Sequence, residues 1–366
     1  MSIIIFIIIL AILVLVHEFG HFIVAKKSGI RVDEFGLGFP PKIFSKKWRG
    51  TLYTLNAIPF GGFVKIFGED SHSEALSEAD KSVSFISKPK WVQALVLVAG
   101  VTMNIIFAWL VISLGFTIGI PSPVGYSTLG HVTDVHLVVT EVRPNSPAEK
   151  AGLISGDTII YASSGKIVLN NQTLTAENVS HMISESTSEK IDISYSRGNG
   201  KPVVVSIVPD TTIVPGKKAI GIAMDDLGIL KLPVHLALVE GARTTWYITE
   251  STTIGLLGFL WDAVRLQSDF SQVSGPVGIA GVVGQAQALG FTYLLSLVAL
   301  ISINLAIINL LPFPALDGGR LLFVGIEAII RRPIKPSIVR WTNALGFALL
   351  LILMIVVTGH DILKLL

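Results

Sequence analysis

The segment IIIFIIILAILVLVHEFGHFIVAKK, residues 3–27, is the stretch from which the rest of the chain can be interpreted. Its apolar run is about as long as the roughly 20 residues that a bilayer-spanning helix requires, so we expect a membrane span over residues 2–25. The polar stretch HEFGH, residues 17–21, interrupts this run. Ionisable residues are costly inside a membrane and usually serve a function, so this stretch is the first candidate for a site.

The spacing within HEFGH is typical of a zinc hydrolase. On a helix, His17 and His21 lie one turn apart, so both imidazoles can face one cation. Glu18 then projects beside them towards a metal-bound water. A match of five residues also occurs by chance in unrelated chains, where histidines in helices are more often satisfied core residues than ligands. The position inside a membrane span favours the catalytic interpretation over this alternative.

Composition indicates a polytopic membrane protein. Of the 366 residues, 51% are hydrophobic and 15% are charged, and the mean hydropathy is +0.68. The net charge of +2 gives no reason to expect a nucleic-acid partner. The chain has no cysteine, so a bound metal has to be held by His, Asp or Glu. The N-terminal segment lacks a basic start and a small-residue cleavage site, so we expect a retained helix and not a signal peptide.

Four spans and two basic loops predict one topology. Further spans are expected at 91–118, 289–311 and 341–357. The loop 26–90 has eleven Lys and Arg against seven Asp and Glu, and the loop after the third span is also basic, so both are expected on the cytoplasmic side. The region 116–284 has eleven Lys and Arg against fifteen Asp and Glu, which favours an external location.

Two features of the first half of the chain have more than one interpretation. Two β-prone runs, 51–58 and 63–67, flank Pro59-Phe60-Gly61-Gly62 and predict a hairpin, either re-entrant with an edge for an extended substrate or a small cytoplasmic β-element. In the second span, Gly100 and Asn104 share one helix face, which indicates close helix packing. A substrate contact by Asn104 is the less favoured alternative.

Residues 120–225 change to short polar runs that predict a soluble α/β module. We expect strands at 138–142, 158–162, 191–196 and 203–208, and helices at 147–152 and 176–185. The segment 226–285 that follows is expected to form amphipathic helices on the membrane surface. A full extra span is less favoured there because charged residues punctuate the segment.

The third span ends in NLLPFPALDGGR, residues 309–320, which offers a third ligand. Two prolines break the helix, and the two glycines after Asp317 allow a tight turn. Asp317 is therefore expected on an irregular segment at membrane depth. Such a segment is tolerated only where protein or a cavity surrounds it.

HEFGH and NLLPFPALDGGR together resemble the site-2 protease family of intramembrane zinc proteases, within the bacterial regulator of sigma E protease branch. IPFGGFVKI (58–66) is similar to the membrane-associated hairpin of that branch, AGVTMN (99–104) to its second-span motif and SGPVGIAG (274–281) to its segment before the third span. RPNSPAEKAGLISGDTII (143–160) resembles a circularly permuted bacterial PDZ domain. The chain departs from the family in having Val101 where Pro is common, and in having room for one PDZ domain where the enterobacterial relative has two.

The resemblance implies specific roles for residues of this chain. His17, His21 and Asp317 are expected to bind Zn²⁺, and Glu18 is expected to be the general base. The expected substrate-binding residues lie on the third span and on the hairpin; they are Asn304, Asn309, Ile58, Gly61, Gly62 and Phe63.

The expected fold is a polytopic α-helical membrane protein with four transmembrane helices, a membrane-associated β-hairpin and one inserted extracytoplasmic PDZ domain. The expected domains are residues 1–119 with the first two spans, 120–225 with the PDZ domain, 226–285 with the interfacial segment, and 286–366 with the last two spans. The PDZ domain is expected to act as a size filter or as a receptor for a trimmed C-terminus.

The expected function is that of an intramembrane zinc endopeptidase in a bacterial inner membrane, cutting single-span proteins such as an anti-sigma factor or remnant signal peptides. Membrane lipids and an upstream site-1 protease acting on the same substrate are the further expected partners. A non-catalytic scaffold that binds substrates through its PDZ domain is one alternative. A transporter using the three ligands as an ion path is another, and it is disfavoured because the two halves of the chain show no internal repeat.

Overall fold

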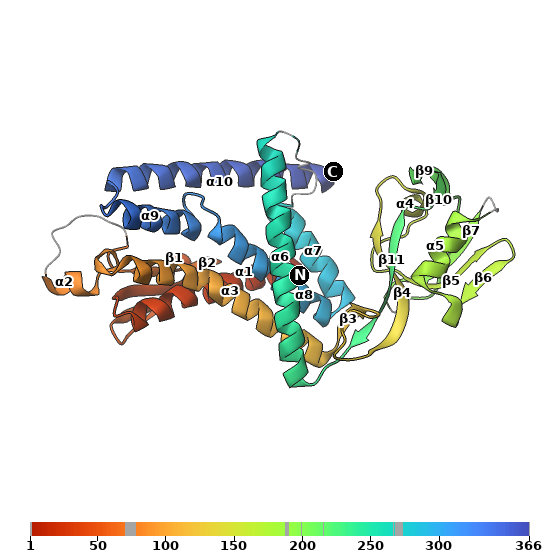
Figure 1. Ribbon diagram of the computed structural model, residues 1–366, viewed down its shortest axis with the longest axis horizontal. Coiled ribbons are helices and arrows are strands. Elements are labelled where there is room, and N and C mark those ends of the chain that lie inside the picture. The colour runs from red at the N-terminus through yellow and green to blue at the C-terminus, as the bar shows by residue number, and fades with distance from the viewer. Residues whose placement is uncertain are drawn as a thin grey trace. The chain divides into compact units, whose positions relative to one another are not determined.

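The structure is a computed structural model that describes residues 2–69, 78–186, 190–198, 200–214, 216–265, 267 and 274–365 (Figure 1). The chain divides into two compact units. The first unit combines Met1–Ser113 with Gly241–Leu366, and the second is Leu114–Glu240. In the sequence, the second unit is therefore an insertion between the two halves of the first.

Four helices are long and apolar enough to cross a membrane. They are α1 (Ser2–Lys27), α3 (Lys90–Ile118), α8 (Phe291–Leu310) and α10 (Pro336–Leu365). Their most apolar windows have mean hydropathies between 2.2 and 2.9. Helices that are apolar on all sides belong in lipid or in a large core, and only 11% of the α10 window is buried by protein. The four predicted spans coincide with these four candidate membrane-spanning helices.

The segment before the third span differs in detail from its prediction. Residues 234–264 form one helix of 31 residues, α6 (Val234–Val264), and α7 (Pro276–Leu289) follows. α6 is not among the helices with a span-like apolar window, in line with the charges that punctuate it. Residues 266 and 268–273 of the predicted interfacial segment lie outside the described residues. The surface location of this segment remains a prediction.

Three short helices complete the helical part of the first unit as described. They are α2 (Glu78–Val83), the 3₁₀ helix η1 (Phe85–Ser87) and α9 (Asp317–Ile330).

The β-element of the first unit corrects the predicted hairpin. β2 (Thr51–Ile66) includes the expected turn at 59–62, but its two halves do not pair with each other; both pair with β1 (Val32–Trp48). The tight turn lies instead at Arg49 and Gly50, whose φ angles are 48° and 81°. The sequence pattern missed β1 because its prolines and lysines interrupt the alternation of apolar and polar residues that marks a strand.

The register of these two strands explains why the predicted turn sequence lies within β2. Residues 34–37 are matched with 62–65 and also with 52–55. Residues 52–55 and 62–65 therefore lie on opposite edges of residues 34–37, and the chain crosses from one edge to the other at 59–62. Gly61, with a φ of 96°, provides the backbone freedom for the crossing. The aromatic ring of Phe22 packs against Phe35 and Tyr53, so the β-element lies against α1.

The second unit is a mixed unit of one large sheet, a small strand pair and short helices. The large sheet has the order β3-β11-β4-β5-β7-β8, with β6 paired to β5, and β9 pairs with β10. The strands are β3 (Ile120–Pro123), β4 (Val132–Val142), β5 (Thr158–Ser164), β6 (Ile167–Asn170), β7 (Ile191–Ser196), β8 (Val203–Ile207), β9 (Asp210–Val214), β10 (Lys217–Ala219) and β11 (Ile222–Leu230). The helices are α4 (Pro147–Lys150), η2 (Asn171–Thr173) and α5 (Ala176–Ser184). The strands and helices predicted for this part of the chain fall on β4, β5, β7, β8, α4 and α5.

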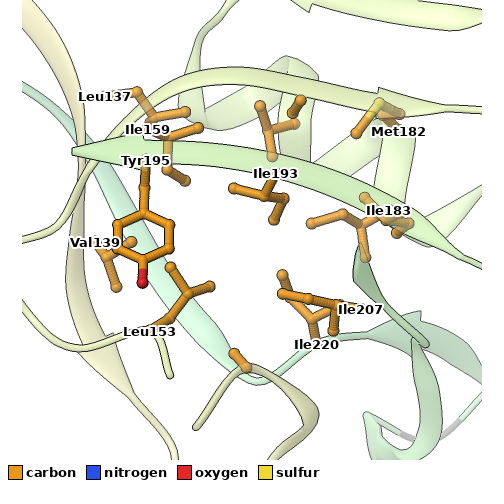
Figure 2. Close-up of a cluster of buried hydrophobic side chains, with 14 residues drawn as sticks. Leu137, Val139, Leu153, Ile159, Met182, Ile183, Ile193, Tyr195, Ile207 and Ile220 are labelled. Atoms are coloured by element: carbon orange, nitrogen blue, oxygen red, sulfur yellow. The ribbon is translucent and has the colours of Figure 1, made fainter. Parts of the chain in front are cut away.

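Buried apolar side chains from the sheet and from α5 form the core of this unit (Figure 2). Figure 2 shows Val139, Ile159 and Ile193 from three strands gathered with Met182 and Ile183 from α5, and all five are at most 5% exposed. Truncating one such side chain to Ala costs about 2–5 kcal/mol of stability. The inserted unit thus has a hydrophobic core of its own.

Candidate metal centre

Helix α1 turns two histidines towards one point. His17 and His21 are each 6% exposed, and their ring centroids lie 4.9 Å apart. Their spacing of one helical turn brings the two Nε2 atoms to 3.2 Å. The geometry predicted for HEFGH is therefore present in the folded helix.

Helix α3 covers these histidines because both helices have glycine at the crossing. A Cβ added to Gly20 would collide with the backbone of Ala99. A Cβ added to Gly100 would lie 2.8 Å from Cε1 of His17 and closer still to Nε2 of His21. The close packing predicted for Gly100 is confirmed, and it occurs directly at the histidine pair.

Asp317 reaches the histidines as the first residue of α9. The prediction that it lies on an irregular segment is wrong, because the turn at 311–316 ends just before it. The strained residue of that turn is Ala315, with a φ of 74°. Gly318 and Gly319 are helical, and a Cβ on either would collide with backbone carbonyls of residues 310–313. The two glycines therefore allow the first turn of α9 to pack tightly on the chain that leads into it.

Three donor atoms converge at this point. Oδ2 of Asp317 lies 2.9 Å from Nε2 of His17 and 3.2 Å from Nε2 of His21. All three potential ligand atoms lie within 4.8 Å of one another. Ligands about 2.05 Å from a tetrahedral zinc are about 3.3 Å apart, so the observed separations fit a zinc ion with one position left open. Two imidazoles and a carboxylate are also a donor set that zinc commonly takes in catalytic sites.

The remaining ring nitrogens contact α3. Nδ1 of His21 lies 2.8 Å from the carbonyl oxygen of Val96, and Nδ1 of His17 lies 3.3 Å from Nδ2 of Asn104. A carbonyl can only accept, so Nδ1 of His21 carries a proton and its Nε2 lone pair points into the site. Sequence reasoning missed Val96, because a backbone carbonyl leaves no sequence signal. For Asn104 the signal was its i, i+4 spacing from Gly100.

Glu18 lies half-buried between the histidines and the β-element. A Cβ on Gly62 would lie 3.8 Å from Cγ of Glu18, and the backbone N–H of Val64 donates to the Glu18 carboxylate. The stretch of β2 that faces α1 is therefore beside the proposed base. Within the described chain no third strand pairs with the β1–β2 sheet, so this stretch of β2 has an open edge.

The other predicted substrate residues lie on two separate elements. Ile58 is 42% exposed and pairs with Phe39, whose ring stacks on Phe63 at a centroid distance of 6.4 Å. Asn304 and Asn309 are half-buried on α8. No hydrogen bond recorded between described residues joins either asparagine to the three converging donors.

Two ion pairs join α9 to neighbouring elements, and the sequence gave no reason to pair their residues. Arg320, one turn after Asp317, pairs with Glu69 just beyond β2. Lys90 at the start of α3 lies 2.5 Å from Glu327 further along α9. Asp317 is the first residue of α9. These two ion pairs hold α9 against the β-element and against α3.

Comparison with known proteins gives concordant matches over the whole chain. The model of peptidase family M50 matches residues 5–353. The zinc metalloprotease RasP of Oceanobacillus iheyensis is 31% identical over an alignment of 443 residues, which covers 100% of this chain and 99% of the relative. The regulator of sigma-W protease RasP of Bacillus subtilis is 31% identical over 444 residues, with the same coverage of both chains. A relative from Clostridium perfringens is 34% identical over 360 residues, covering 96% of this chain and 95% of its own.

Proposed function

The chain belongs to peptidase family M50, the site-2 protease family, and from this premise we propose that His17, His21 and Asp317 hold its zinc and that Glu18 is its general base. It is a zinc metalloendopeptidase of the membrane, and membership of a peptidase family favours catalysis over the scaffold and transporter alternatives. The observation that carries the assignment is the convergence of three donor atoms from α1 and α9, 300 residues apart in the chain.

The side chains around the metal have distinct tasks in this proposal. Bound zinc supplies a Lewis acid that activates water and polarises a peptide carbonyl. Glu18 takes a proton from the attacking water and returns it to the leaving amine, so its role is that of a base and not of a ligand. The N–H of Val64 orients the Glu18 carboxylate.

The open edge of β2 is our candidate for holding the substrate. The backbone of a transmembrane helix is hydrogen-bonded internally, so its carbonyls cannot reach a metal until the helix unwinds. Each polar group freed in lipid costs several kcal/mol unless it finds a partner. Residues 62–66 lie beside Glu18 and can pair with an unwound segment by edge addition, with Ile58, Gly61 and Phe63 shaping the approach. The side-chain amides of Asn304 and Asn309 are further proposed contacts.

We assign the second unit to a PDZ domain outside the cytoplasm. A concavity of about 260 Å³ lies between α5 and the start of β11 and is lined by Ile183, Ile222 and Met224. Lys217 is exposed at its rim and can meet a terminal carboxylate. This hollow favours the receptor role over the size-filter role. The test is binding of a labelled peptide with a free C-terminal carboxylate against the same peptide amidated, in wild type and in Lys217→Glu.

A size filter would give a different result from a receptor. Equal binding of the two peptides, together with loss of the preference for trimmed substrates after deletion of residues 127–225, would favour the filter. Unchanged selectivity after that deletion would contradict both roles.

The proposed substrates are single-span membrane proteins in a bacterial inner membrane. The B. subtilis relative is named a regulator of sigma-W protease, which supports an anti-sigma factor as substrate. Remnant signal peptides are a second substrate class. A site-1 protease acting first on the same substrate is the proposed upstream partner. The basic loops support an active site near the cytoplasmic face in the proposed topology.

The decisive experiment compares wild type with Glu18→Gln. Both proteins, purified in detergent, are assayed for zinc content and for cleavage of a model single-span substrate. The proposal expects about one zinc in each and cleavage by wild type only. Loss of zinc in the variant would make Glu18 a ligand, and cleavage by the variant would exclude Glu18 as the base.

A further inference from the structure

Asn104 of α3 is buried against His17 in a way that packing alone does not explain. Its side chain is fully buried, and its Nδ2 lies 3.3 Å from Nδ1 of His17. Its Oδ1 is one of the few buried polar side-chain atoms in the described chain without a hydrogen-bond partner. A buried amide oxygen without a partner costs about 1–3 kcal/mol, so its neighbourhood points to a missing interaction.

The chemistry of a metal-binding imidazole identifies that interaction. A neutral imidazole has one N–H and one lone pair. Nε2 of His17 is the atom that faces Asp317 and His21, so a metal bound there leaves the proton on Nδ1. An N–H on His17 and the NH₂ group of Asn104 would then be two donors facing each other. A half-turn of the amide brings Oδ1 to Nδ1 and removes both the clash and the unpaired oxygen.

We infer that Asn104 is a positioning residue whose Oδ1 accepts the Nδ1 proton of His17 and so fixes the tautomer that binds zinc through Nε2. This inference rests on the metal site proposed above. In this inference Asn104 supports a metal ligand and does not bind the substrate. Asn104 acts through His17 and does not touch the reacting bond.

The same helix already orients the other histidine in this manner. The carbonyl of Val96 accepts from Nδ1 of His21 at 2.8 Å. Val96, Gly100 and Asn104 are spaced four residues apart, so they form one stripe along α3. In this stripe two acceptors flank the glycine that allows the close approach. Ser302 of α8 donates to the backbone carbonyl of Asn104 at 2.9 Å, which holds the stripe in place.

The test measures zinc affinity in the full-length protein in detergent, by competition with a chromogenic chelator. Residues that orient a metal ligand contribute about 10–100-fold to metal affinity, so Asn104→Leu should weaken zinc binding by that factor. Asn104→Asp keeps an acceptor and has no donor, so it should retain wild-type affinity or exceed it. Ser113→Ala, a buried polar change elsewhere on α3, should leave the affinity unchanged.

The d–d absorption spectrum of the Co²⁺-substituted protein provides a readout of ligand geometry that global destabilisation would not reproduce. It should change in Asn104→Leu and be restored in Asn104→Asp. Wild-type affinity in Asn104→Leu would overturn the inference. Equal weakening in the Leu and Asp variants would also overturn it, since Asn104 would then act as a donor. A wild-type protein that binds no zinc would instead remove the metal site itself.

Discussion

The carboxylate oxygen Oδ2 of Asp317 lies 2.9 Å from Nε2 of His17, although 300 residues separate them in the chain. The two residues come from α1 and α9, which belong to the N-terminal and C-terminal sequence segments of one compact unit. The inserted second unit lies between them only in sequence. Zinc binding at the proposed site would therefore require that these two segments of the chain have assembled.

Replacing the third ligand should remove the metal. In Asp317→Asn the amide oxygen is neutral and binds zinc more weakly than a carboxylate, so zinc content should fall from about one per chain to well below that value. Metal analysis after dialysis measures this. Asp361→Asn is the control, because Asp361 is a buried acid of the same unit that accepts from the backbone N–H of Gly278 at 2.8 Å, away from the histidines. Full zinc content in Asp317→Asn would mean that another residue completes the site.

A methyl group at the helix crossing should displace the histidines. In Gly100→Ala the new Cβ would lie 2.8 Å from Cε1 of His17, far inside normal contact, so α3 or the rings have to shift. We expect at least a tenfold loss of zinc affinity and of cleavage rate, since ligand geometry is set by this contact. Gly258→Ala on α6 has open space around its Cβ and should change neither quantity. Unaltered zinc affinity in Gly100→Ala would show that the crossing can relax without cost.

Removing a backbone donor from the open edge of β2 should impair cleavage and leave the metal in place. Gly62→Pro eliminates one N–H close to Glu18, and an unwound substrate would lose one pairing partner. We expect cleavage of a transmembrane substrate to fall by about tenfold, the value of roughly one hydrogen bond, at unchanged zinc content. Lys46→Pro disrupts the exposed part of β1 and serves as the control for damage to the sheet. Normal cleavage by Gly62→Pro would contradict edge addition.

The stability of the second unit should depend on the buried carboxylate of Asp157. Asp157 has no exposed surface and accepts from Nε of Arg197 at 2.8 Å and from the backbone N–H of Ile154 at 2.9 Å. Asp157→Asn weakens charge-assisted bonds and should destabilise this unit by about 2 kcal/mol. Amide hydrogen exchange of β5 and β7 in the intact protein should then quicken by roughly 30-fold. Asp192→Asn on the exposed side of β7 is the control, and equal exchange in the two variants would exclude a special role for Asp157.

Much of this protein can be derived from the order of its residues. The four spans follow from apolar runs of sufficient length, because a helix in lipid satisfies its own backbone and requires only an apolar surface. His17 and His21 face one point because four residues make about one helical turn. The strands and helices of the second unit follow from local alternation and turn residues.

Other features exist only in the folded chain. The partner of β2 is β1, whose prolines and lysines conceal a strand, and pairing between strands is a non-local interaction that local sequence patterns do not specify. Asp317 is a helix N-terminal residue because Gly318 and Gly319 allow a close approach that only the packed backbone defines. The hydrogen-bond contacts between α3 and the histidines arise because two helices cross at Gly20 and Gly100. The sequence alone therefore predicted the side chains that we propose as metal ligands, while the packing of α3, α9 and β2 around them determined their orientation.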